Sequence, residues 1–355
     1  GVMVGVPLLV AAGFTPHRAA VLGLLGLCAV PWGALGPGTI IAGELIGSTP
    51  DEVGVATAWP NIVVFLGVGI AAVLFASPGR PRPVHLLAAV VSAVLVWAGV
   101  LTSSLLIGMA PSGALGALVA IIGHLLWRRF RGTAIAVPRR VRHSLVPYAV
   151  LLAGILAGTW TVHSLELTEA GAYLASPATW LVVTCLTALW WLPLPRDTRR
   201  PVLHESISMW QHVALPTAAF LALGVVMVLG GLTGPLAEAL AATGPVALVL
   251  TPVIGAVGGF VTGSGAGANS MFAAGTGAVA PGLGVAPVAL VGVQNAAACL
   301  LTMASPARVL LAVRSCPTQG VSPANQATLP RVTRAVLLVD VVLVAALAGW
   351  SLVVL

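Results

Sequence analysis

The densest group of residues able to bind a ligand is TGSGAGANS, nine small or polar residues in a row at positions 262–270. Its hydroxyl and amide side chains belong to Thr262, Ser264, Asn269 and Ser270. Such groups can hydrogen-bond a carboxylate or a 2-hydroxyl group, and the intervening Gly263 and Gly265 let the backbone approach a ligand closely. A single Gly-x-x-x-Gly would instead favour close helix packing, but an uninterrupted run of this length favours a binding site.

Two other apolar stretches are interrupted in a similar way. Prolines and glycines interrupt residues 31–44, and polar residues punctuate 294–305. A helix that starts at a break inside a membrane points N–H groups and its positive dipole end at the adjoining space, which suits a carboxylate. Polar residues within a span are often functional, although an amide can equally join two helices. From these stretches the further candidate substrate-binding residues are Gly33, Gly36, Asn295 and Ser305.

Motifs for enzymes and metals do not fit the spacing of the candidate residues. His204-Glu205 followed by His212 lacks the H-E-x-x-H spacing of zinc proteases, and GSGAG follows no soluble strand of a nucleotide-binding fold. The four cysteines are scattered in or beside apolar segments, without metal or disulfide spacing; they are Cys28, Cys185, Cys299 and Cys316. We therefore predict no catalytic residues, no metal and no cofactor.

Few ionisable side chains could couple transport to protons. Candidates are Glu44, His163 and Asp340, of which Asp340 is the clearest acid within an apolar segment. An acid there must find a partner, a cavity or a proton. Arg331 and Arg334 precede Asp340 by more than one helical turn, so the sequence alone does not select a proton relay.

Composition indicates that these residues sit in a membrane protein. The 355 residues are 59% hydrophobic and 7% charged, with a mean hydropathy of +1.06, whereas a soluble domain is roughly 25% charged. All 16 basic residues are arginines in short clusters between apolar runs. This pattern marks cytoplasmic loops rather than a nucleic-acid surface, so the expected partners are the lipid bilayer and a small solute, and not nucleic acid.

Apolar runs predict about eleven membrane segments, since a span needs about 20 apolar residues. They are expected near 1–13 (partial), 17–33, 53–77, 84–109, 112–127, 144–164, 177–194, 208–231, 244–262, 285–304 and 332–354. Arginines place the loop 128–143 in the cytoplasm, and Glu166 with Glu169 on the opposite side. The chain opens with GVMVGVPLLV, which has no charged n-region and looks like a start within a longer protein.

The predicted fold is all-α: a polytopic transmembrane helical bundle with broken helices and a re-entrant hairpin. The hairpin covers 244–281, because the orientation of later arginines requires both of its ends on the outside. Two interrupted segments, one in each half, favour inverted repeats, although residue identities reveal none. We divide the chain into a first-half bundle (1–127), a basic cytoplasmic loop (128–143) and a second-half bundle (144–355) with a Gly-rich broken segment at 255–281.

At the glycine-rich turn the sequence resembles the lactate permease family. GAVGGFVTGSGAGANSMF is similar to that family's G-x-F-x-T-G-S-x-x-x-x-N-x-x-F pattern, and QNAAACLLTMASPARV (294–309) to its N-x-x-G-x-M-x-S-P segment. Weaker matches at PLLVAAGF (7–14), WGALG (32–36) and Pro147-Tyr148 occur in the same order. Family members carry Asp or Asn, then Thr and Ser, after T-G-S, where this chain has residues 265–268 as GAGA. Members also extend further at the front, with a Gly-rich turn before the residues present here.

The resemblance implies a secondary active transporter that takes up lactate, glycolate or related 2-hydroxy monocarboxylates with protons across the cytoplasmic (inner) membrane. The expected partners are thus a small organic anion and protons, and the protein is not an enzyme. Two alternatives stay open. A non-transporting membrane sensor or scaffold would tolerate changes at the glycines, and a passive anion channel would show flux without saturation.

Overall fold

A computed structural model describes residues 2–132, 139–165, 169–191, 196–231, 233–316 and 323–355, and its regular elements over these ranges are all helices. In chain order they are α1 (Val2–Ala11), α2 (Pro16–Leu25), η1 (Gly26–Ala29), η2 (Gly33–Leu35), α3 (Pro37–Ile46), α4 (Pro50–Ala76), α5 (Pro83–Leu106), α6 (Met109–Phe130), α7 (Arg139–Ser164), α8 (Glu169–Ala175), α9 (Pro177–Trp191), α10 (Arg196–Leu229), α11 (Thr233–Ala241), α12 (Pro245–Thr262), α13 (Gly265–Val279), η3 (Ala280–Leu283), α14 (Pro287–Ala304), α15 (Pro306–Arg314) and α16 (Pro323–Val354).

Helices long and apolar enough to cross a bilayer confirm the predicted polytopic α-helical fold. Within the described ranges seven helices qualify, and an eighth span results if the bent pair 16–29 and 33–46 is counted as one. Large apolar side chains lie exposed on their outer faces, among them Leu106, Phe130 and Val353. Such a surface requires lipid contact rather than water. Each of the eleven expected segments corresponds to a helix; residues 133–138 of the predicted basic loop and Glu166 lie outside the described ranges.

The breaks are narrower than the sequence suggested. Residues 37–44, expected as part of the break at 31–44, belong to the regular helix α3, and the bend before this helix is 44°. The chain turns there through Ala34, Leu35 and Gly36, all with positive φ. In the glycine-rich segment only positions 263–264 interrupt the helix, and α13 runs through the glycines that follow. Small residues there let α13 pack closely on its neighbours, and this packing outweighs the weak helix propensity of glycine.

The chain contains two similar units, α1–α4 and α13–α16. In each, a helix leads to a glycine with positive φ followed three residues later by a proline, Gly13 to Pro16 and Gly284 to Pro287. A second helix then breaks and gives way to a short and a long helix that both begin with proline. The counterpart of the first break is therefore Ser305, between α14 and α15. The sequence had instead suggested the Gly-rich segment at 255–281 as its counterpart.

Packing shows that the two units run in opposite directions. The Cys299 thiol on α14 points to the carbonyl of Cys28, and that of Cys316, after α15, to the carbonyl of Pro16, so this stretch is antiparallel to α2. Gly67 of α4 lies against Leu343 of α16, so these two equivalent helices are also paired. Paired equivalent helices are antiparallel only if the axis that relates the units is perpendicular to them, which agrees with the predicted inverted repeats.

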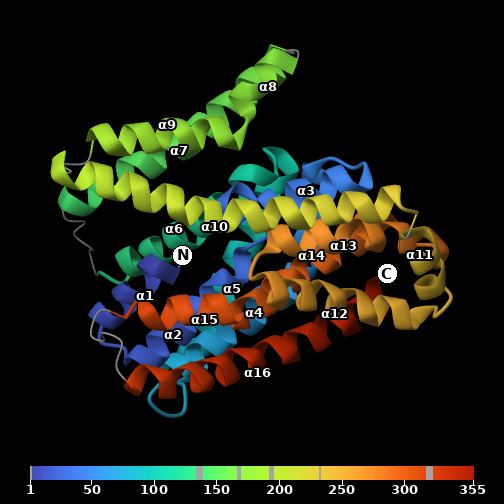
Figure 1. Ribbon diagram of the computed structural model, residues 1–355. Coiled ribbons are helices and arrows are strands. Elements are labelled where there is room, and N and C mark those ends of the chain that lie inside the picture. The colour runs from blue at the N-terminus through green and yellow to red at the C-terminus, as the bar shows by residue number, and fades with distance from the viewer. Residues whose placement is uncertain (1, 133–138, 166–168, 192–195, 232, 317–322) are drawn as a thin grey trace.

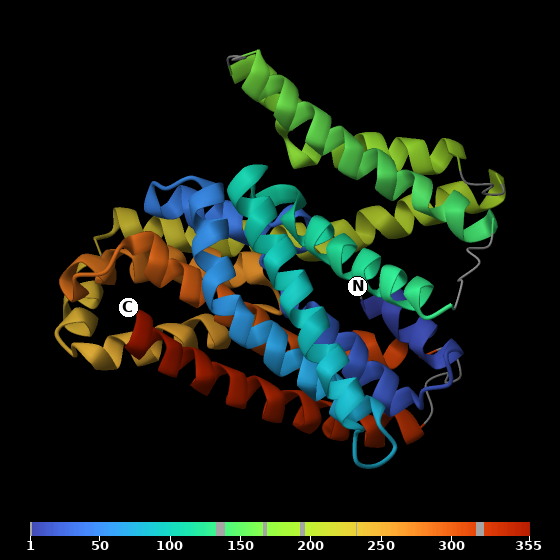
Figure 2. The same cartoon turned by 180° about the vertical axis from the view of Figure 1, so that it is seen from behind.

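The short helices α3 and α13, which each begin at a break and are called half-helices below, lie at the centre of this arrangement. α12 and α13 form a hairpin whose tip is Gly263-Ser264, and α13 packs parallel to α3, with Gly38 beside Gly265 and Ile46 beside Gly277. α14 packs against α4, α12 and α13, and the long helix α10 lies along α13 (Figure 1). α7, α8 and α9 project from one side of the molecule, away from the half-helices (Figures 1 and 2).

Candidate functional site

A cavity of about 750 Å³ lies where the half-helices α3 and α13 begin. Its walls come from the first break, the hairpin tip, α10, α14 and α15. The lining residues are Gly26, Leu27, Ala29, Val30, Pro31, Gly33, Ala34, Pro37, Gly38, Trp210, Ala214, Ala218, Leu221, Ser264, Gly265, Ala266, Asn295 and Arg308. Most of these are small or apolar, so the few polar groups determine what the cavity can bind.

Two helix N-termini meet at the wall of this cavity. A Cβ atom added to Gly38, in the first turn of α3, would lie 2.8 Å from the carbonyl carbon of Gly265 and 2.9 Å from the nitrogen of Ala266. The N–H of Ile40 makes the first backbone hydrogen bond of α3, and that of Ala268 the first of α13. The N–H groups before them lie at the positive ends of both helix dipoles, which is favourable for an anion.

Arg308 adds a positive charge to the same cavity, and it is the only charged side chain among the described residues that line it. Its Nε donates a hydrogen bond to the carbonyl oxygen of Gly263, 2.9 Å away. The backbone N–H of Arg308 donates to Ser305 Oγ, which caps α15, at 3.4 Å. The guanidinium is thereby tied to the hairpin tip by one nitrogen, and its remaining N–H groups are donors suited to a carboxylate.

A buried network of amides and hydroxyls fixes the two half-helices against α14 and α4. Asn269 Nδ2 donates to the Gly38 carbonyl at 2.9 Å and to Asn295 Oδ1 at 2.8 Å. Asn295 Nδ2 donates in turn to Thr39 Oγ1 at 2.9 Å and Thr57 Oγ1 at 3.1 Å. Gln294 Nε2 completes the network by donating to Asn269 Oδ1 at 3.0 Å. Because the members are buried, losing one would leave several polar groups unpaired.

Comparison with known proteins shows a family match that covers the second unit and the helices directly before it. A profile of the L-lactate permease family matches residues 159–349, more than half of the chain, including the hairpin, the Ser305 break and α16 as far as residue 349. The chain belongs to the L-lactate permease family. It is therefore a multi-pass membrane protein that transports lactate, a small organic anion. No curated protein and no solved structure matched the chain.

The residues predicted to bind substrate take different places in this lactate transporter. Gly33, Ser264, Gly265 and Asn295 line the cavity. The others lie next to it or behind it: Gly36, Thr262, Gly263, Asn269, Ser270 and Ser305. Thr262 and Ser305 stabilise the two breaks, since Thr262 Oγ1 lies 2.8 Å from the carbonyl oxygens of both Gly258 and Ser264.

Several side chains at this site were not among the residues predicted to bind substrate. Sequence analysis favoured a topological anchor for Arg308 over a residue that attracts an anion from the cytoplasmic side, because nothing indicated that the side chain reaches Gly263, 45 residues away. It named neither Thr39 nor Thr57, which bond to Asn295 across more than 230 positions. Trp210 of α10 was read only as part of an apolar span, yet it lines the cavity. Neither the two threonines nor Trp210 carried a local signal.

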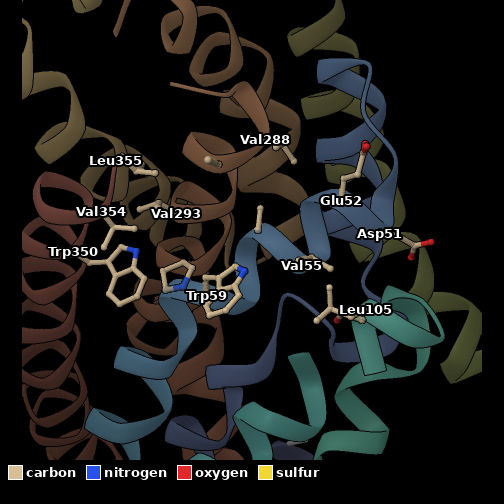
Figure 3. A pocket seen from close by; sticks show the side chains of 14 residues that line it. Asp51, Glu52, Val55, Trp59, Leu105, Val288, Val293, Trp350, Val354 and Leu355 are labelled. Carbon is tan, nitrogen blue, oxygen red and sulfur yellow. The ribbon is translucent and has the colours of Figure 1, made fainter. Parts of the chain in front are cut away.

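A second cavity of the transporter, about 570 Å³, lies between the start of α4 and the ends of α5 and α16. Trp59 and Trp350 flank it on one side and Asp51 and Glu52 on the other (Figure 3). Both acids have structural roles: Asp51 accepts from the Met109 N–H at 2.7 Å, and Glu52 forms a capping box with Thr49. The carboxylates repel an anion, and the apolar walls offer it no hydrogen bonds. The first cavity is therefore the candidate substrate site.

Proposed function

We propose that the chain is a proton symporter for lactate, glycolate and related 2-hydroxy monocarboxylates in the cytoplasmic membrane, and that it binds them in the cavity at Gly38, Gly265 and Arg308. One observation carries this proposal: two helix N-termini and the guanidinium of Arg308 converge on one cavity. Each feature favours a carboxylate, and together they supply several donors without a counter-charge from the lining residues.

In this proposal each part of the substrate has a matching group. The carboxylate lies at the first-turn N–H groups of α3 and α13 and beside Arg308. The 2-hydroxyl group bonds to Ser264 or Asn295, whose side chains can both donate and accept. Leu27 and Val30 line the apolar side of the cavity and contact the short alkyl group of the substrate.

The GAGA sequence at 265–268 is compatible with this binding mode. Family members carry polar side chains after T-G-S, but the donors proposed here are backbone N–H groups, which Gly265 and Ala266 retain. Small side chains at these positions also allow α3 to approach, as the closeness of Gly38 illustrates. We therefore propose that the turn remains a substrate site, with backbone donors in place of side-chain ligands.

Uptake of radiolabelled lactate and glycolate into proteoliposomes tests this function. A symporter accumulates substrate when the outside is more acidic, saturates with concentration and exchanges external for internal substrate at equal pH. Flux that never saturates and shows no counterflow would indicate a passive anion channel. No uptake of any short carboxylate by correctly inserted protein would favour a sensor or scaffold and would overturn the proposal.

A further inference from the structure

Asp340 is a carboxylic acid buried in the middle of α16 with no bonding partner. Its side chain is 0% exposed, and among the described residues neither carboxyl oxygen has a hydrogen-bond partner. It lies near the centre of the apolar stretch Thr328–Val354. A carboxylate without partners at this depth is strongly disfavoured, whereas the neutral acid is tolerated. This conformation therefore favours protonated Asp340.

The helices packed against α16 are α2, α4, α12, α14 and α15, and they bring few charges. α12 carries no ionisable residue. The other helices have their charged or titratable residues at their ends, apart from Cys299 within α14; the full set is His17, Arg18, Asp51, Glu52, Cys299, Arg308 and Arg314. On α16 itself, Arg334 precedes Asp340 by six residues, a separation of roughly 9 Å along the helix axis. Cys299 lies close enough to Asp340 to interact with it electrostatically whenever Asp340 is ionised.

Cys299 connects Asp340 to the wall of the substrate cavity. Its Sγ lies 3.5 Å from the carbonyl oxygen of Cys28, on η1, and the neighbours Leu27 and Ala29 line the cavity. Cys299 also follows Asn295 by one helical turn on α14, so both lie on the same face of that helix. Asp340 thus lies on a helix packed against α14, which carries Asn295 into the lining of the cavity.

We propose that Asp340 is the residue that binds and releases the transported proton. The proposal rests on the proton symport proposed above. The conformation seen here needs a neutral Asp340, so the proton must be bound before the protein can adopt it. Deprotonation requires a second conformation in which water or a cation reaches the carboxylate, and α14, which packs against α16 and lines the cavity through Asn295, would move between the two. Movement of one lactate anion with this proton is electrically neutral.

Asp340→Asn in proteoliposomes tests this role, because the amide imitates the neutral acid but cannot release a proton. We expect lactate–lactate exchange at equal pH to stay within about three-fold of the wild type. The amide is always neutral, so the variant can adopt the conformation seen here without first binding a proton. Accumulation driven by a pH gradient should fall at least ten-fold, and lactate-dependent proton uptake, followed with an internal pH dye, should disappear. Glu238→Gln, the same change from carboxyl to amide at an exposed residue on α11, is the matched control and should leave all three measurements unchanged.

The outcomes separate the two proposals. Gradient-driven accumulation by Asp340→Asn at the wild-type level would overturn the role of Asp340 and leave proton symport intact. Wild-type lactate transport that does not respond to pH would refute the symport itself. If Asp340→Asn does not insert, wild-type protein labelled with a hydrophobic carbodiimide, which reacts with neutral carboxyls in apolar surroundings, decides the matter. We expect labelling at Asp340 that slows as pH rises; labelling independent of pH would overturn the proposal.

Discussion

Gly38→Ala tests whether the close approach of α3 and α13 forms the substrate site. The added Cβ would lie 2.8 Å from the Gly265 carbonyl carbon, about 0.6 Å closer than ordinary van der Waals contact. Backbone atoms surround the position, so the two helix starts must separate. Overpacking of this kind costs about 1–3 kcal/mol, from which the better helix propensity of alanine recovers roughly 0.5–1 kcal/mol.

The separation should weaken lactate binding because the donors of α3 and α13 no longer fit one carboxylate. If about 1–2 kcal/mol of binding is lost, KM for lactate uptake rises roughly 5- to 30-fold. KM from initial rates in proteoliposomes, together with the thermal midpoint of the purified protein, measures the effect.

Gly275→Ala is the matched control, since it makes the same change within α13 at a position with no atom within 4 Å of the new Cβ. It should keep the wild-type KM and raise the thermal midpoint slightly. A Gly38→Ala protein with wild-type KM and midpoint would refute the proposed convergence of donors at this site.

Other substitutions probe the side chains around the cavity. Arg308→Gln should raise KM for lactate about ten-fold, as loss of a charge-assisted bond predicts, with Arg308→Lys intermediate; equal KM values in all three proteins would exclude a substrate contact. Ser264→Leu should abolish uptake while the protein still inserts, because leucine fills the cavity at the hairpin tip; retained uptake would contradict the site. Asn269→Leu leaves the partners of a buried amide unpaired, at about 1–3 kcal/mol for each group, so the thermal midpoint should fall together with uptake; an unchanged midpoint would argue against the network.

The course of the chain through the membrane could be predicted from local signals. Nine of the described helices begin at a proline, a residue that suits the first helical turn because its missing N–H is not needed there. Apolar length then gave each span to within about five residues, apart from the early starts of α10 at Arg196 and of α16 at Pro323. The short helices were missed, because α3 and α15 are too short and too rich in proline, glycine or charge to register as spans.

The site could be predicted only in part, because its decisive contacts are between residues far apart in the chain. Glycines near 263 predicted a break, but the sequence did not show that α13 would remain helical. Neighbouring side chains fill the space beside two of its glycines: Thr262 lies against Gly267, and Ile46 against Gly277. Packing partners of this kind decide whether a glycine-rich segment forms a helix, and they become visible only in three dimensions.

The repeat accounts for the position of the proposed site at the breaks, and the differences between its halves account for the proposed preference for anions. Each unit starts a short helix with proline after a break, α3 at Pro37 and α15 at Pro306. The third helical residue differs, since Thr39 follows Gly38 in α3 whereas α15 has Arg308 after Ala307. Thr39 bonds into the amide network, and Arg308 bonds to the hairpin tip. The first unit thus supplies the backbone donors of α3, the second supplies those of α13 and the positive charge, and neither unit alone contains the complete cavity.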